Sequence, residues 1–121
     1  MYQVGDVLKN RNDMGHWWVI IACCPLTNDF LLTNWTTFSP KKEQTCILKI
    51  GDHPSIIHDS AIMYYYTRTF TETQLDQLIS NENWIKLSPV NSTILSKIRQ
   101  KALETKRMNP VLQSRFKPYL I

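Results

Sequence analysis

The sequence predicts an α+β protein, mainly β, in which a small barrel or strongly curled sheet precedes two C-terminal helices. Three observations predict this class. Residues 1–70 hold five or six short segments rich in β-branched and aromatic residues, separated by turn signals at the spacing typical of small barrels. Residues 71–121 carry apolar residues at helical spacing instead. A chain of 121 residues, 43% of them hydrophobic, has the size of a single domain with its own core.

The most strongly patterned strand of the body is expected at 16–24. Both of its faces are apolar, with Trp17 and Trp18 on opposite sides, and this pattern is typical of a strand in the covered centre of a sheet. Pro25 is expected to end it, because proline cannot donate a hydrogen bond to a neighbouring strand. The other strands of the body are expected at 4–8, 30–38, 45–50 and 60–70.

The C-terminal part, 71–121, is expected to be mostly helical. Thr71–Gln74 has the Thr-x-x-Gln form of a capping box, and the apolar residues after it recur at helical spacing, so one helix is expected to begin there. Residues 84–87 predict a short edge strand. A second helix is expected at about 93–106, with Asn109–Pro110 ending it. The remaining C-terminal residues are expected to pack back on the body.

The charge is distributed unevenly along the chain. Residues 1–85 carry six Lys/Arg against nine Asp/Glu, a net charge of −3, whereas residues 86–121 carry eight against one, a net charge of +7. This uneven charge indicates that the basic C-terminal part binds an acidic partner, either nucleic acid or protein. The alternative is a solvated helix face that only keeps the protein soluble, and the sequence does not separate the two.

Cysteine usage and hydropathy indicate a soluble protein of the cytoplasm. The odd count of three, Cys23, Cys24 and Cys46, argues against a disulfide framework and favours a reducing compartment. There is no Cys-x-x-C pair, so a structural zinc site is disfavoured, and no cofactor is expected. No apolar run has the length of a membrane span, and the N-terminus lacks the pattern of a secretory signal.

Three histidines, His16, His53 and His58, lie at predicted strand ends or turns, where catalytic groups on a rigid scaffold are often found. A lone histidine at such a place is more often structural or merely exposed. The segment 51–60 contains two Asp-His neighbours that could orient the imidazoles. A metal site there is disfavoured because a third ligand is lacking. A serine triad from 58–60 is disfavoured because successive strand residues point to opposite faces.

The Thr-Asn-Trp-Thr-Thr segment at 33–37 forms a polar patch at the end of a predicted strand. In a binding groove, Trp35 could act as a stacking platform for a nucleic-acid base. The structural alternative is that the threonines are ordinary strand residues and that Trp35 belongs to the core.

Four segments, taken in order, resemble one known family. They are Val-Gly-Asp-Val at 4–7, His-Trp-Trp-Val-Ile-Ile at 16–21, Asn-Trp-Thr-Thr at 34–37 and His-Asp-Ser-Ala-Ile at 58–62. These are similar to the R-G-D-[VI], R-P-[AV]-L-[VI]-[VI], P-x-T-S and K-x-S-x-[VI] segments of the PemK/MazF family of growth-inhibitor toxins. A capped helix follows, as in that family, and the resemblance covers about residues 3–80.

The resemblance implies an SH3-like barrel, usually dimeric, that cuts single-stranded RNA without metal by attack of the RNA's 2′-hydroxyl. An Arg before the second strand and a Thr of the P-x-T-S segment do much of this chemistry in the family, and their positions here are His16 and Thr36. The Pro after the Arg is replaced by Trp17. His58 is the third catalytic candidate. The candidates for RNA contact are Lys9, Arg11, Trp35, Thr37, Ser60, Lys97, Arg99 and Lys101.

Because a histidine stands at the family's Arg position, two further hypotheses stay open beside the endoribonuclease toxin. One is a non-catalytic module on the same barrel that binds nucleic acid through its basic tail. The other is a protein-interaction subunit whose tail docks an acidic partner such as an antitoxin. The toxin hypothesis itself implies a homodimer, single-stranded RNA as substrate and an acidic antitoxin as partner.

Overall fold

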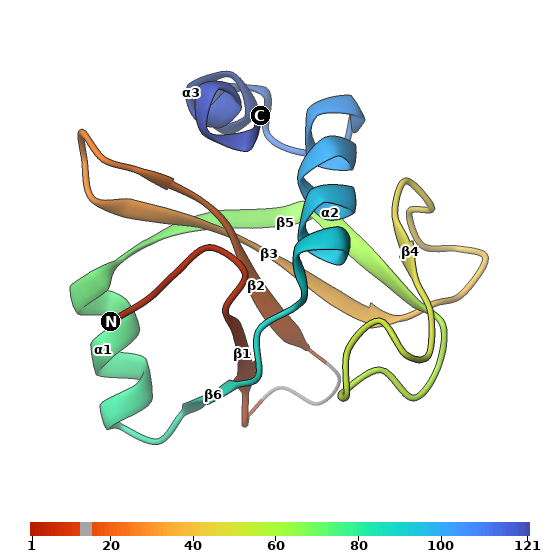
Figure 1. Ribbon diagram of the computed structural model, residues 1–121, viewed down its shortest axis with the longest axis horizontal. Coiled ribbons are helices and arrows are strands. Elements are labelled where there is room, and N and C mark those ends of the chain that lie inside the picture. Colours follow the sequence, from red (N-terminus) through yellow and green to blue (C-terminus); the bar gives the residue numbers. More distant parts are fainter. Residues whose placement is uncertain (13–15) are drawn as a thin grey trace.

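The computed structural model describes residues 1–12 and 16–121, which form a curled half-barrel sheet with three helices (Figure 1). The sheet is open and has the order β4-β5-β3-β2-β1-β6, with every neighbouring pair antiparallel. This confirms the predicted α+β class with a curled, mainly β body. The strands are β1 (Val7–Asn10), β2 (Trp17–Cys24), β3 (Asp29–Thr37), β4 (Ile47–Leu48), β5 (Ser60–Thr71) and β6 (Trp84–Leu87).

β2 lies inside the sheet, between β3 and β1, as its two apolar faces predict. On one face Val19 and Ile21 belong to a core cluster shared with the C-terminal helices, and both are fully buried. On the other face Trp18 and Ile20 belong to a second cluster. Burying one such side chain contributes about 1.5–3 kcal/mol, so the strand is stabilised from both sides.

The helices are α1 (Glu72–Ser80), α2 (Ser92–Glu104) and α3 (Pro110–Leu120). Figure 1 shows α2 and α3 next to each other, away from α1. The predicted capping box of α1 is confirmed, because Gln74 N donates to Thr71 Oγ1 at 3.1 Å and Thr71 N donates to Gln74 Oε1 at 2.8 Å. Within the described ranges, no helix is long and apolar enough to span a membrane.

α3 differs from the expectation that Asn109–Pro110 only ends the preceding helix. α2 already ends at Glu104, and the two residues begin a new helix instead. The Asn109 side chain accepts a hydrogen bond from Val111 N at 2.8 Å, and Pro110 occupies a first-turn position where no N–H is needed. The helix then buries Phe116 in the core.

β4 is shorter than the predicted strand at 45–50. Ile50, which the alternation places inward, is 70% exposed. The reason is an early turn, in which Lys49 N donates to Asp52 Oδ2 at 2.8 Å and Gly51 adopts a φ of 100°. A positive φ of this size suits glycine, so the chain leaves the sheet before Ile50 can point into the core.

β5 leaves the regular ladder with β3 near its middle. Leu32 pairs with Arg68 and Asn34 pairs with Met63, so the single residue Thr33 of β3 faces four residues of β5. A bulge of this kind bends the strand and re-aims its side chains, and such bulges are common beside functional sites.

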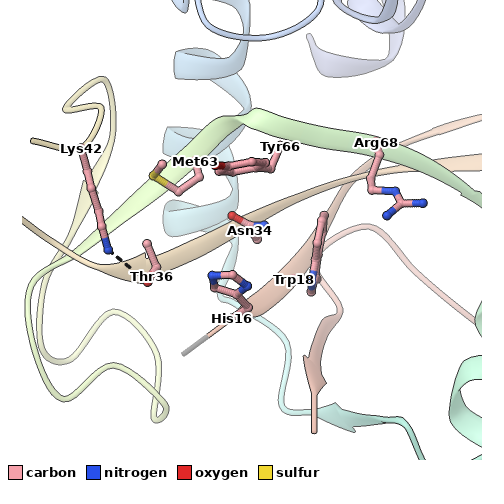
Figure 2. Close-up of a pocket in the computed structure, with 8 residues that line it drawn as sticks. All are labelled: His16, Trp18, Asn34, Thr36, Lys42, Met63, Tyr66 and Arg68. Carbon is pink, nitrogen blue, oxygen red and sulfur yellow. Dashed lines mark hydrogen bonds between the residues drawn. The ribbon is translucent and has the colours of Figure 1, made fainter. Parts of the chain in front are cut away.

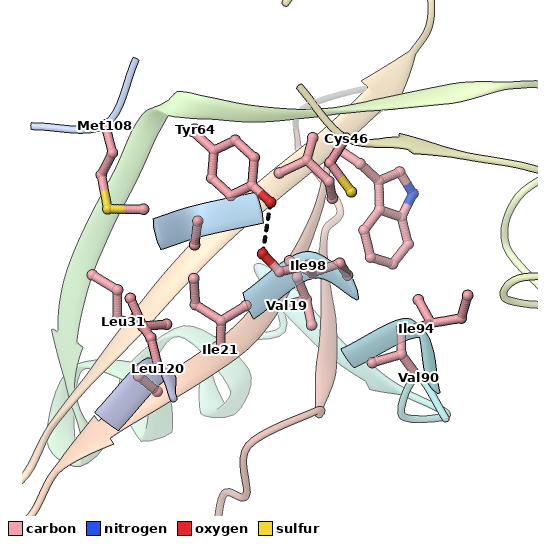
Figure 3. Packing of buried hydrophobic residues seen from close by; sticks show 14 of the residues in the cluster. Val19, Ile21, Leu31, Cys46, Tyr64, Val90, Ile94, Ile98, Met108 and Leu120 are labelled. Atoms are coloured by element: carbon pink, nitrogen blue, oxygen red, sulfur yellow. Dashed lines mark hydrogen bonds between the residues drawn. The ribbon is translucent and has the colours of Figure 1, made fainter. Parts of the chain in front are cut away.

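The bulge sends neighbouring tyrosines in different directions. The buried Tyr64 donates its hydroxyl proton to Ile98 O at 2.7 Å, which ties α2 to β5 (Figure 3). Tyr65 and Tyr66 stay outside, 67% and 52% exposed. The buried carboxylate of Glu43 accepts a hydrogen bond from Tyr64 N and so satisfies a bulge amide. Burial raises the pKa of Glu43, although the N–H groups of Tyr64 and Tyr65 oppose this.

Candidate functional site

An open cleft of about 420 Å³ lies over the middle of the sheet, where β2, β3 and β5 are neighbours. Figure 2 shows the side chains that line it, which come from these strands, from the segment before β2 and from the loop after β3. The lining residues are His16, Trp18, Asn34, Thr36, Lys42, Met63, Tyr66 and Arg68.

The strand register explains why His16 and Thr36 meet in this cleft. Trp18 of β2 pairs with Asn34 of β3, so their side chains are neighbours on one face. Side chains two residues apart along an extended chain share a face, which adds His16 and Thr36 to the same surface. Continuing the antiparallel register brings these two residues opposite each other. Met63 of β5 pairs with Asn34 from the other side.

Two cations give the cleft its charge. Lys42 Nζ donates to Thr37 O at 2.9 Å and lies 3.4 Å from Thr36 Oγ1, so the ammonium group stands beside the threonine hydroxyl (Figure 2). The Arg68 guanidinium lies 4.9 Å from the centroid of the Phe70 ring, a cation–π distance. Among the described residues that line the cleft none is acidic, so the surface favours an anion such as a phosphate group.

The floor of the cleft contains two buried polar atoms without a partner. Trp18 Nε1 and Asn34 Oδ1 make no hydrogen bond within residues 1–12 and 16–121, and the two residues are 7% and 3% exposed. A buried polar atom without a partner costs about 1–3 kcal/mol. A third such atom, Trp35 Nε1, lies on the opposite face of the sheet, so unpaired polar atoms are not confined to the cleft.

Of the residues expected from the resemblance, His16 and Thr36 lie together in the cleft, and His58 does not line it. His58 is exposed, in the segment before β5. Its backbone oxygen accepts a hydrogen bond from Ser60 Oγ at 2.9 Å, and Ser60 itself is buried. His53, the third histidine, is buried and structural: it accepts from Ser55 N at Nδ1, so its Nε2–H donates to Ser88 O at 2.6 Å.

The structure places Trp35 and Thr37 outside the cleft as well. Trp35 is 1% exposed on the opposite face of the sheet, where its ring stacks on Trp17 at 6.5 Å, and it has no free face for a base. The Thr37 side chain is exposed, and its carbonyl oxygen accepts the hydrogen bond from Lys42. Thr37 therefore acts on the cleft through its backbone, by holding Lys42 in place.

The basic candidates are likewise placed away from the cleft. Lys9 Nζ lies 5.1 Å from the centroid of the Trp17 ring, and Arg11 Nη1 contacts Glu82 O at 3.5 Å. The candidates on α2 make contacts with the body or within the C-terminal helices. These contacts are Lys97 Nζ with Ile47 O at 2.6 Å, Arg99 with Tyr119 O, and Lys101 with Glu104 at 3.7 Å.

Sequence reasoning did not select five of the lining residues, and it named Asn34 only as a member of the polar patch at 33–37. Trp18 and Asn34 follow from strand alternation, since each lies two residues from His16 or Thr36 along its strand. The other four depend on the loop after β3, on the register between β3 and β5 and on the β5 bulge, for which the sequence carries no recognisable signal. They are Lys42, Met63, Tyr66 and Arg68.

No group of three or more metal-binding side chains gathers anywhere in the described ranges. No family model matches the chain, and no curated protein or solved structure shows significant similarity to it.

Proposed function

We propose that the chain binds single-stranded RNA in this cleft and cleaves it by attack of the RNA's own 2′-hydroxyl, without a metal ion. The observation that carries the proposal is the shared cleft. His16 and Thr36, the two positions expected from the resemblance, line it together with Lys42 and Arg68. An imidazole can act as the base, and a hydroxyl and two cations can stabilise the negative charge that develops when a phosphodiester is cleaved without metal.

In the proposed reaction, neutral His16 accepts the proton of the 2′-hydroxyl, whose oxygen attacks the adjacent phosphorus. The bond to the 5′-oxygen breaks, and that oxygen takes up a proton from solvent water. One fragment ends in a 2′,3′-cyclic phosphate and the other begins with a 5′-hydroxyl. Negative charge grows on the phosphate oxygens during the attack. Lys42 and Arg68 stabilise this charge, and the Thr36 hydroxyl donates a hydrogen bond to it.

The wider role that we propose is a growth-inhibiting toxin, acting as a homodimer in the cytoplasm and held inactive by an acidic antitoxin. The support is the ordered resemblance over residues 3–80 and the net charge of +7 on 86–121, which favours an acidic partner. Expression of the chain in bacteria is expected to arrest growth. Co-expression of a small acidic protein from a neighbouring gene is expected to relieve the arrest.

The chemistry is tested on purified protein with a fluorescent single-stranded RNA in excess EDTA. Wild type is expected to cleave it and leave 2′,3′-cyclic phosphate ends. His16→Ala is expected to lower the rate about 100-fold or more, since a positioned acid or base contributes at least this much. Thr36→Val, which removes only the hydroxyl, is expected to lower it about tenfold. His58→Ala removes an imidazole that lies outside the cleft. Comparing the cleavage rates of His16→Ala and His58→Ala therefore shows which histidine cleavage needs.

Full activity of His16→Ala, or cleavage only when a divalent metal is added, would refute the assignment. The second candidate function is RNA binding without cleavage, which is favoured by the histidine at the family's Arg position. It predicts that wild type binds the RNA intact, with an affinity that falls steeply as salt is raised, because each phosphate contact releases counterions.

A further inference from the structure

A second hollow adjoins the cleft. It measures about 240 Å³, and it shares Lys42, Met63 and Tyr66 with the first, so these three side chains form a common rim. The residues that line the second hollow are Lys41, Lys42, Glu43, Met63, Tyr65, Tyr66 and Arg107. A ligand lying in the cleft can therefore continue across the rim without leaving the surface.

Two exposed aromatic rings line the second hollow. Tyr65 and Tyr66 are 67% and 52% exposed, and their ring centroids lie 5.1 Å apart at an angle of 86°. Consecutive residues of a regular strand point to opposite faces, so two neighbouring rings can line one hollow only because β5 bulges here. Exposed aromatic rings offer flat faces, on which any unpaired nucleic-acid base can stack.

The hollow also carries positive charge. Lys41, Lys42 and Arg107 contribute cations from the loop after β3 and from the segment between α2 and α3. The one carboxylate in its lining, Glu43, is 8% exposed and turned toward the backbone N–H of Tyr64. Its carboxylate is therefore held at the bulge, and it also interacts electrostatically with Arg107. Aromatic rings beside cations are the combination that binds the bases and the phosphates of a single strand.

We propose that the second hollow is a nucleotide subsite, in which Tyr65 stacks on an unpaired base and Arg107 contacts the phosphate next to the one held in the cleft. This inference rests on the proposed function, because it names how the same RNA strand continues from the cleavage site. The substrate is then a single strand with at least two successive phosphodiesters, which means at least three nucleotides, and it crosses the rim formed by Lys42, Met63 and Tyr66. A duplex is excluded from the subsite, since paired and stacked bases cannot reach the Tyr65 ring.

The test measures binding and cleavage separately. Binding is followed by fluorescence anisotropy with the full-length His16→Ala variant and a labelled single-stranded RNA of about six nucleotides, a length within the range of such sites. Adding Tyr65→Ala is expected to weaken binding about tenfold, whereas Tyr65→Phe keeps the ring and is expected to bind like the parent. Arg107→Gln is expected to weaken binding. It is also expected to reduce the slope of log affinity against log salt concentration by the amount that corresponds to about one phosphate contact.

Lys106→Gln is the matched control for Arg107→Gln, because it removes the same charge from the neighbouring exposed residue, which lines neither hollow. It is expected to bind RNA like the parent, and a duplex of the same sequence is expected to bind more weakly than the single strand. The subsite is overturned if Tyr65→Ala binds like the parent, if Tyr65→Phe is as weak as Tyr65→Ala, or if Lys106→Gln loses as much as Arg107→Gln.

The cleavage assay keeps the two proposals apart. If wild type cuts no RNA but binding depends on Tyr65 and Arg107 as described, the subsite stands and the nuclease fails. If wild type cuts RNA, Tyr65→Ala and Arg107→Gln made in the wild-type background cut it at the wild-type rate, and the same changes in the His16→Ala background leave binding unaltered, the nuclease stands and the subsite fails.

Discussion

Replacing Asn34 with leucine is expected to make the protein more stable and less active. Asn34 is 3% exposed, and its Oδ1 has no hydrogen-bond partner among the residues that the structure describes. Leucine has the same number and branching of side-chain heavy atoms, although it is larger, and it removes the unpaired oxygen. An unsatisfied buried polar atom costs about 1–3 kcal/mol, and imperfect fit of the branched side chain offsets part of the gain. We expect the free energy of unfolding to rise by about 1 kcal/mol.

The expected rise in the melting temperature is about 4 °C, given the usual relation between free energy and Tm for a domain of this size. It is measured by thermal and urea denaturation at neutral pH. Thr33→Val is the matched control at the neighbouring position. The Thr33 hydroxyl is fully buried and accepts a hydrogen bond from Thr67 Oγ1 at 3.0 Å, so its removal is expected to lower the stability by about 1 kcal/mol.

The rate of RNA cleavage by Asn34→Leu is expected to fall although the variant is more stable, because the Asn34 carboxamide lies in the floor of the cleft. A drop in stability comparable to that of Thr33→Val would show that the Asn34 carboxamide is satisfied in the native protein. The argument for a functional reason behind its unpaired oxygen would then be lost.

Three further predictions concern buried titratable groups. His53→Ala is expected to lower the free energy of unfolding by about 2 kcal/mol in urea titrations, since it removes the bridge between Ser55 N and Ser88 O; an unchanged midpoint would contradict this. Glu43 has a raised pKa in the folded state, so the native protein holds this proton to higher pH than the unfolded chain does. The stability of wild type relative to Glu43→Gln is therefore expected to decline as pH rises from the ordinary glutamate range through the raised pKa, and a difference that grows with pH would contradict it. Cys46 is 1% exposed and burial raises the pKa of its thiol, so it is expected to react with an aromatic disulfide reagent only after denaturant is added, as mass spectrometry of the labelled peptides would show.

Most of the secondary structure was predictable because it depends on local patterns. The doubly apolar segment at 16–24 became the interior strand β2, and Thr71–Gln74 formed the capping box that its spacing indicates. α3 was missed for a physical reason. An Asn-Pro pair serves both as the end of one helix and as the start of another, and only the packing of Phe116 in the core decides between them.

The site was predictable only where it depends on strand register. His16 and Thr36 lie on one face because alternation and antiparallel pairing place them there, and the resemblance named those positions. Arg68 and Tyr66 reach the cleft because β5 gains extra residues opposite Thr33. No residue pattern in a single sequence marks the position of such a bulge, since it arises from how two strands distant in the chain fit together.

The irregular course of β5 also bears on self-association. β5 is 12 residues long, but β4 covers it with only two residues, Ile47 and Leu48, at its beginning. A long, straight strand at the rim of a sheet is a template on which another chain can add a strand and start a fibril. The bulge of β5 opposite Thr33 divides this edge into two short segments, and a flat incoming strand cannot pair with both of them. Trimming the extra residues to straighten β5 is therefore expected to increase aggregation.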